Sequence, residues 1–277
     1  MQLATKANKE FLATAEPRSA NDWDTLLEYQ VDLAFPQELE FLLALPAFKN
    51  ATDILDAGCG NGYYLSRLQQ FFPEKAYCGV DISPELIARG MDRYPAVSLS
   101  VGDIAAYCPA RQFDLIIMRF VVQHLKDLDG ILAAAGRLLK PSGSLLIIES
   151  DLARSANFPP LPAFTDMLHT FARVSADHGS LKPRLLASPH QLLAQTDSGW
   201  IVERDDCVTA AQTGPFTASK LLAVYSLWVD LCERSRMFAF DFDAVRKELQ
   251  TWAARRAIFS TVALRMIVIK RREGRLQ

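Results

Sequence analysis

The chain has 277 residues, of which 50% are hydrophobic and 22% charged, and its formal net charge is -2 at pH 7. This composition excludes a globally disordered chain and predicts one large α/β domain or a core domain with a cap. A near-neutral charge gives no reason to expect a nucleic-acid partner, since nucleic-acid-binding domains normally carry a basic excess.

The five cysteines are odd in number and widely spaced, and no C-x-x-C pair occurs. This pattern predicts neither a zinc site nor a disulfide framework, so no metal is expected. The N-terminus lacks the continuous apolar segment of a signal peptide, and no run reaches the ~18 apolar residues of a membrane span. Reduced thiols in a cytoplasmic protein are therefore expected. The sequence does not indicate an oligomeric state.

Residues 1–50 form a predicted N-terminal helical segment. Apolar residues recur at helical spacing over residues 21–45, with a break expected near Pro36. Such a segment either closes over a pocket or covers the edge of a sheet, and covering an edge is the more usual case.

Residues 51–151 alternate between predicted strands and predicted helices, which is typical of a parallel sheet. Ser83, Pro84 and Glu85 are the residue types expected at the N-cap and first turn of a helix. Another helix is expected from Asp127 to Leu139. The predicted strands are 53–56, 76–81, 97–101, 113–118 and 145–149.

The alternation ends after Asp151. Residues 152–198 are predicted to form a helical cap insertion, which begins with a proline-rich connector and ends with a short helix from Ser188. Residues 199–277 are predicted to return to the sheet with strands at 200–203 and 261–269. Helices inserted within residues 216–256 separate these two strands.

A glycine-rich loop, Gly58–Gly62, follows Asp56 at the end of the first predicted strand and precedes an amphipathic helix. This order predicts a nucleotide-type cofactor site at the carboxyl edge of a parallel sheet. A dinucleotide fingerprint needs a third glycine at position 63, where this chain has Tyr63, and no P-loop lysine follows. The charge of Asp56 disfavours a pyrophosphate and favours a ligand with a cationic group.

Three aspartates follow three successive predicted strands. They are Asp56, Asp81 and Asp103. The ends of these strands lie side by side in a doubly wound sheet, so the three carboxylates are expected to face one elongated ligand. Asp81 lies 81 − 62 = 19 residues after the last loop glycine, close to the ~20-residue offset of an acidic residue that binds a ribose.

These motifs together resemble those of the class I S-adenosylmethionine-dependent methyltransferases, within them most closely the ubiquinone/menaquinone methyltransferase-like small-molecule group. The resemblance covers about residues 53–151. Its motifs are the D-x-G-C-G-x-G loop at 56–62, the acidic residue Asp81, Gly102-Asp103-Ile104, Phe113-Asp114-Leu115-Ile116, and Leu138-Leu139-Lys140-Pro141-Ser142-Gly143-Ser144-Leu145, with Ser142 where glycine is usual.

The resemblance implies an α/β, doubly wound Rossmann-like sheet that is mostly parallel with an antiparallel last strand. It also implies S-adenosylmethionine as cofactor and a role for each matching residue. The implied contacts are the backbone of Gly58, Cys59 and Gly60 with the methionine part, Asp56 with its ammonium, Asp81 with the ribose, Ile82 and Ile104 with the faces of the adenine, Asp103 with its amino group, and Arg119 with either the methionine carboxylate or a structural salt bridge.

His124 follows the fourth predicted strand and is the candidate general base. The alternative is a wall residue of the cofactor pocket. The fourth strand ends in Met118-Arg119-Phe120, which lacks the Pro-Pro motif used on nucleobase amines. We therefore expect methyl transfer to a small, partly apolar acceptor. A non-catalytic S-adenosylmethionine-binding protein is the alternative, and Tyr63 disfavours a nicotinamide oxidoreductase.

Overall fold

The computed structural model describes residues 20–196, 199–213, 215–255 and 258–272. Its strands are β1 (Asp53–Ala57), β2 (Ala76–Asp81), β3 (Ser98–Val101), β4 (Phe113–Arg119), β5 (Leu139–Ser150), β6 (Ala156–Phe158), β7 (Trp200–Thr213) and β8 (Phe259–Arg271). The helices are α2 (Ala20–Ala44), α3 (Pro46–Lys49), α4 (Tyr63–Phe71), α5 (Pro84–Arg93), α6 (Leu128–Leu138), α7 (Pro162–Asp177), α8 (Leu181–Ala187), α9 (Pro189–Ala194), α10 (Pro215–Ser235) and α11 (Phe242–Ala253), with short 3-10 helices η1 (Val122–His124) and η2 (Leu152–Arg154).

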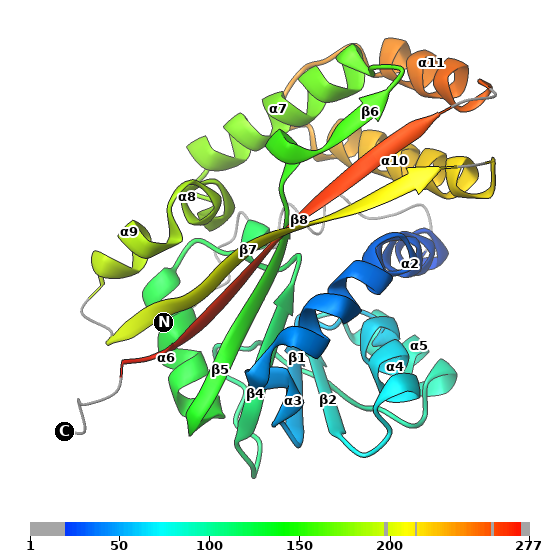
Figure 1. Cartoon of the computed structure of the whole chain (residues 1–277). Helices are drawn as coiled ribbons and strands as arrows, with labels where there is room; N and C mark the ends of the chain where they lie inside the picture. The colour runs from blue at the N-terminus through cyan, green and yellow to red at the C-terminus, as the bar shows by residue number, and fades with distance from the viewer. Residues whose placement is uncertain (1–19, 197–198, 214, 256–257, 273–277) are drawn as a thin grey trace.

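The described strands form one sheet in the order β3-β2-β1-β4-β5-β8-β6, and β7 also pairs with β8 (Figure 1). The five strands from β3 to β5 are parallel, whereas β8 runs antiparallel to β5, β6 and β7. The predicted doubly wound sheet, mostly parallel and with an antiparallel last strand, is confirmed.

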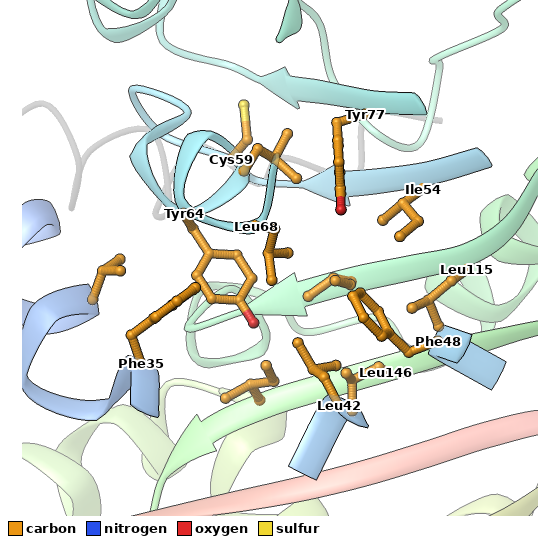
Figure 2. Packing of buried hydrophobic residues seen from close by; sticks show 14 of the residues in the cluster. Phe35, Leu42, Phe48, Ile54, Cys59, Tyr64, Leu68, Tyr77, Leu115 and Leu146 are labelled. Carbon is orange, nitrogen blue, oxygen red and sulfur yellow. The ribbon is translucent and has the colours of Figure 1, made fainter. Parts of the chain in front are cut away.

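Each central strand sends alternate side chains to two hydrophobic clusters, as the period of a strand requires. Ile54, Leu115 and Leu146 belong to the cluster under α2, α3, α4 and α5, and Figure 2 shows them beside Phe48 and Tyr64. Their immediate neighbours Leu55, Ile116 and Leu145 belong to the opposite cluster, under α6, α8 and α9. Both faces are therefore covered, and the near-continuous apolar strands of the sequence follow from this double burial.

A third cluster joins α7, α10 and α11, which lie together beyond β6 in Figure 1. Leu26 and Leu33 of α2 belong to it as well. We call this cluster, with the helices that form it, the cap. The predicted boundaries at residues 50, 151 and 198 stay predictions. Within the described residues, no helix has the length and apolar character needed to cross a membrane.

Helix starts follow the local signals in the sequence. Ser83 Oγ accepts a hydrogen bond from the N–H of Leu86 at 3.3 Å, and Pro84 is the first residue of α5. Asp127 Oδ1 accepts from the N–H of Gly130 at 3.0 Å at the start of α6. Both side chains satisfy N–H groups that have no partner within the helix.

The expected break near Pro36 is wrong, because α2 runs through this residue. A proline inside a helix costs about 3 kcal/mol, so tertiary contacts must offset that cost. Ala34 and Phe35 before it and Leu42 after it are buried in the same cluster, and Glu38 forms a buried ion pair with Arg119. Packing on both sides of Pro36 therefore holds α2 in one piece.

Several further elements differ from expectation, including the short strand β6, which overlaps the predicted proline-rich connector. The strand predicted at 200–203 extends to Thr213, along the antiparallel ladder with β8. The added part of β7 contains charged residues, which are not typical of a strand. Charged residues of β7 form ion pairs with β8, such as Asp205 with Arg265 and Glu203 with Lys270. Such pairs suit a strand that has only one neighbour. Helix α8 was not predicted.

Candidate functional site

The glycine loop turns sharply between β1 and α4. Gly58, Gly60 and Gly62 have φ angles of 89°, 56° and 76°, a region that side chains disfavour. A Cβ on Gly58 would lie 2.4 Å from Val121 Cγ2, and one on Gly60 would lie 2.8 Å from Leu27 Cδ1. Both positions therefore need glycine for conformation, and Gly58 needs it for space as well.

Four of the five backbone N–H groups of the loop, those of Gly58, Cys59, Gly60 and Gly62, donate to groups of the protein itself. Gly58 and Cys59 both donate to the carbonyl of Val80, at 2.7 and 3.1 Å. Gly60 donates to Asp81 Oδ2 at 2.8 Å. Because these donors are occupied, a ligand at the loop meets mainly carbonyl and carboxylate oxygens. That arrangement favours a cationic group over a phosphate.

A cavity of about 650 Å³ opens over this loop. This volume lies within the usual range for small-molecule sites. It brings together all ten residues that the sequence singled out, although their individual roles stay predictions. They are Asp56, Gly58, Cys59, Gly60, Asp81, Ile82, Asp103, Ile104, Arg119 and His124.

Asp56 is the most unusual acid of this cavity. It is 2% exposed, and its Oδ1 has no hydrogen-bond partner among the described residues. Burial raises the pKa of Asp56 to about 7, the positive charge of Arg119 opposes this rise, and the negative charges of Asp81 and Glu38 add to it. A buried carboxyl oxygen without a hydrogen-bond partner costs free energy, so a hydrogen bond from a cationic ligand group would be favourable there.

Asp81 holds the loop and the next helix together. Its Oδ2 accepts from Gly60, and its Oδ1 accepts from the N–H of Ser83 at 2.9 Å. Burial raises the pKa of Asp81, and these backbone hydrogen bonds oppose the rise. Each carboxylate oxygen has a second lone pair, so both remain able to accept from ligand hydroxyls. Asp103 Oδ1 accepts from the N–H of Ala105 at 3.0 Å.

Arg119 forms the salt bridge that the sequence left as one of two alternatives. Its Nη2 lies 2.8 Å from Glu38 Oε1, and both side chains are almost fully buried. The same Nη2 donates to the carbonyl of Gln30 at 3.0 Å. Glu38 was not predicted as its partner, because 81 positions separate the two residues. A contact with a methionine carboxylate stays a prediction, since Arg119 also lines the cavity.

His124 lies in η1, just beyond the end of β4. Burial lowers the pKa of His124 to about 4, and the positive charge of Lys182 lowers it further. The imidazole is therefore neutral at pH 7 and a weaker base than an ordinary histidine. The role of general base stays a prediction.

A second cavity, of about 860 Å³, adjoins the first. We call it the cap cavity, because α7 and α10 supply much of its wall, including Phe164, Leu168, Leu221 and Val224. Phe120 lines both cavities and has a positive φ of 59°, which is strained for a residue other than glycine. The junction of the two cavities is defined by the residues that line both, namely Gln30, Phe120, Gln123, His124, Leu125, Lys126, Phe171 and Trp228.

Helix α2 does both things that the sequence allowed, since it packs against the edge strand β7 and also lines a pocket. Trp23 and Leu27 line the first cavity, and Gln30 lines both. Asp24 Oδ1 accepts from Asn61 Nδ2 of the glycine loop at 2.8 Å, and Asp24 Oδ2 accepts from Arg89 of α5 at 3.0 Å. The buried carboxylate of Asp24 therefore joins α2 to both the glycine loop and α5.

The known proteins that resemble this chain in sequence are methyltransferases. A malonyl-[acyl-carrier protein] O-methyltransferase of Priestia megaterium is 33% identical over 141 residues, or 50% of this chain and 51% of that protein. A trans-aconitate 2-methyltransferase of an Acidovorax species is 31% identical over 127 residues, or 46% of this chain and 49% of that protein. The chain thus spans about half the length of these curated relatives.

Among solved structures, a S-adenosylmethionine-dependent methyltransferase from Thiobacillus denitrificans in complex with S-adenosyl-L-homocysteine has 19% sequence identity and a TM-score of 0.47. The match covers 85% of this chain and 90% of that one. The family model described as a methyltransferase domain matches residues 27–201, which is more than half of the chain. The chain therefore belongs to the methyltransferase-domain family.

Proposed function

We propose that the chain is a S-adenosylmethionine-dependent methyltransferase that acts on a small, partly apolar acceptor. The observation that carries the proposal is that one cavity is lined by all ten predicted site residues, among them Asp56, whose buried Oδ1 has no hydrogen-bond partner among the described residues. When bound, S-adenosylmethionine supplies an electrophilic methyl group on a sulfonium centre. The protein then contributes mainly alignment and the exclusion of water.

The residues present fit this cofactor. Asp56 and the loop carbonyls would accept from the methionine ammonium, because four of the five N–H groups of the loop are already used. Asp81 would accept from the ribose hydroxyls with its remaining lone pairs. Asp103 would accept from the adenine amino group, between the side chains of Ile82 and Ile104.

The cap cavity would hold the acceptor, because it adjoins the cofactor cavity and its wall is largely apolar. We propose that residues 51–151 bind the cofactor and that residues 152–198, with the helices inserted within 216–256, form the acceptor side. His124 would take a proton only from an acceptor that must lose one. With other acceptors it would serve as a wall of the junction.

The relatives support methyl transfer, since their names specify a malonyl group on acyl-carrier protein and the small molecule trans-aconitate as acceptors. They do not name the acceptor of this chain, because the match spans only half of each. All five cysteines are free thiols, which supports a cytoplasmic location as the proposed compartment.

Titration calorimetry with S-adenosylmethionine, S-adenosylhomocysteine and NAD tests the proposal. We expect both sulfur ligands to bind and NAD to fail. Absence of binding by S-adenosylmethionine at millimolar ligand would exclude the methyltransferase and the non-catalytic S-adenosylmethionine-binding alternative together. Binding without methyl transfer across a broad acceptor panel would favour the non-catalytic alternative.

A further inference from the structure

Two lysines lie where the segment after β4 meets the start of α8. Leu181 N–H donates to the carbonyl of Leu125 at 2.9 Å, and Ser180 Oγ donates to the carbonyl of Gln123 at 2.9 Å. Lys126 and Lys182 immediately follow the two residues joined by the first of these bonds. Both line the cap cavity, and Lys126 also lines the junction with the cofactor cavity.

The charge of Lys182 is already balanced. Its Nζ lies 3.4 Å from Glu149 Oε2, a fully buried carboxylate, and donates to Ser150 Oγ at 2.7 Å. Glu149 itself does not line the cap cavity. Lys182 therefore adds a hydrogen-bond donor to the wall of the cap cavity, but little net positive charge.

Lys126 is different, because no ion pair or hydrogen bond of its side chain occurs among the described residues. It is only partly exposed, and its stem passes close to Gly179. The neighbouring Asp127 accepts from Gly130 as the cap of α6. An ammonium that lines a cavity and has no counter-ion among the described residues can form a charge-assisted hydrogen bond with an anionic ligand.

The other charged groups of the cap cavity do not offset this lysine. Asp151 is the one carboxylate in its described wall, and it pairs with Arg154 and Arg265. Arg154 lines the cavity too. Among the described residues that line both cavities, Lys126 therefore has the one charged side chain, while Phe164, Leu168 and Val224 give the cap cavity an apolar wall.

We propose that the cap cavity binds an amphipathic carboxylate, with the carboxylate at the junction beside Lys126 and Lys182 and the apolar body between α7 and α10. The inference rests on the proposed function, since it names the class of acceptor. A carboxylate is already deprotonated at neutral pH. It therefore suits a junction whose histidine, His124, has a lowered pKa and is a weak base.

Calorimetry on the full chain saturated with S-adenosylhomocysteine tests this binding. The probes are 4-phenylbutyrate and octanoate, each compared with its primary amide. We expect each carboxylate to bind at least 10-fold more tightly than its amide, since a hydrogen bond to a charged group contributes about 1.5–3 kcal/mol and 1.4 kcal/mol corresponds to about 10-fold. The preference should shrink as salt is added.

Lys126→Met keeps most of the side-chain volume and removes the charge. It should abolish the preference for carboxylate while leaving amide binding unchanged, and Lys126→Arg should retain it. Lys247→Met, on the exposed face of α11 and outside both cavities, is the matched control and should behave as the original chain. The affinity for S-adenosylhomocysteine reports whether each variant is folded.

Equal binding of acid and amide, no binding of any carboxylate, or an unaltered preference in Lys126→Met would each overturn the inference. The titration with S-adenosylhomocysteine shows whether the acceptor class alone is wrong or the proposed function is wrong as well. If S-adenosylhomocysteine binds and the carboxylate preference is absent, only the acceptor class is wrong. If S-adenosylhomocysteine does not bind, the proposed function itself is wrong.

Discussion

The two adjoining cavities are built in different ways. The cofactor cavity takes its acids from the ends of β1 and β2 and from the turn after β3, and backbone hydrogen bonds hold Asp81 in place. The cap cavity takes its wall from segments far apart in the chain, between Gln30 and Leu264, and most of its wall is apolar. Under the proposed function, local motifs would determine which methyl donor binds and tertiary packing which acceptor binds, as expected when function resides in sites added to a common fold.

The largest effect should come from the buried ion pair that joins α2 to β4. Arg119→Met leaves the carboxylate of Glu38 buried without its partner, so the free energy of unfolding should fall by about 3–5 kcal/mol. Urea unfolding at constant m-value measures this change.

Two variants control for this effect. Adding Glu38→Leu to Arg119→Met removes both charges and should restore most of the lost stability. Arg173→Met breaks an ion pair with Asp177 in which the arginine side chain is 70% exposed, and should change stability by less than about 0.5 kcal/mol. A double variant no more stable than Arg119→Met would mean that packing around the arginine matters more than its charge.

The second effect is a pH dependence confined to the cofactor side. The pKa of Asp56 is raised from 3.8 to about 7 in the folded chain, so the folded state holds a proton that the unfolded state releases. This contribution to stability is fully present below about pH 4 and is lost as pH rises through about 7. Given the size of the pKa change, this proton contributes at most about 4 kcal/mol to the free energy of unfolding.

Asp56→Asn isolates this contribution, because the amide does not titrate. Relative to this variant, the original chain should lose stability between pH 4 and 8 in urea unfolding, and saturating S-adenosylhomocysteine should reduce the loss by placing an ammonium beside the carboxylate. His124 acts in the opposite sense, since its pKa is lowered to about 4 and stability is lost as pH falls from about 6.5 toward 4. Parallel curves for the two proteins would show that Asp56 is ionised throughout.

The same contrast explains how far the sequence predicted the structure. The period of apolar residues, the loop glycines and the N-cap residues are local, so the parallel strands and the ten residues around one cavity were predictable. Glu38 beside Arg119 and Lys182 beside His124 were not, because each pair joins elements far apart in the chain. Pro36 indicated a break that packing overrode, and the strand predicted at 200–203 continues through charged residues that form cross-strand ion pairs.

A smaller effect on ligand affinity should follow from removing a contact that holds α2 against the glycine loop. Gln30 of this helix lines both cavities. Asp24→Ala removes the acceptor for Asn61 and Arg89. We expect the affinity for S-adenosylhomocysteine to fall about 10- to 150-fold, which corresponds to the about 1.5–3 kcal/mol of a charged hydrogen bond. Glu40→Ala, an exposed position on the same helix, should leave the affinity unchanged. Equal effects of the two variants would mean that helix propensity, and not the contact with the loop, holds α2.

The smallest effect gives the sharpest test of separate cavities, and it needs two leucines of the same size. Leu27 lines only the cofactor cavity, where it faces Gly60, and Leu168 lines only the cap cavity. Leu27→Ala removes apolar contact worth about 1–2 kcal/mol, so the affinity for S-adenosylhomocysteine should fall about 5- to 30-fold. Leu168→Ala should leave that affinity within twofold, while it weakens binding of apolar carboxylates in the cap. Calorimetry with both ligands on both variants gives four values. If either variant changes both affinities equally, the two cavities act as one site, and donor and acceptor recognition are not separable in this chain.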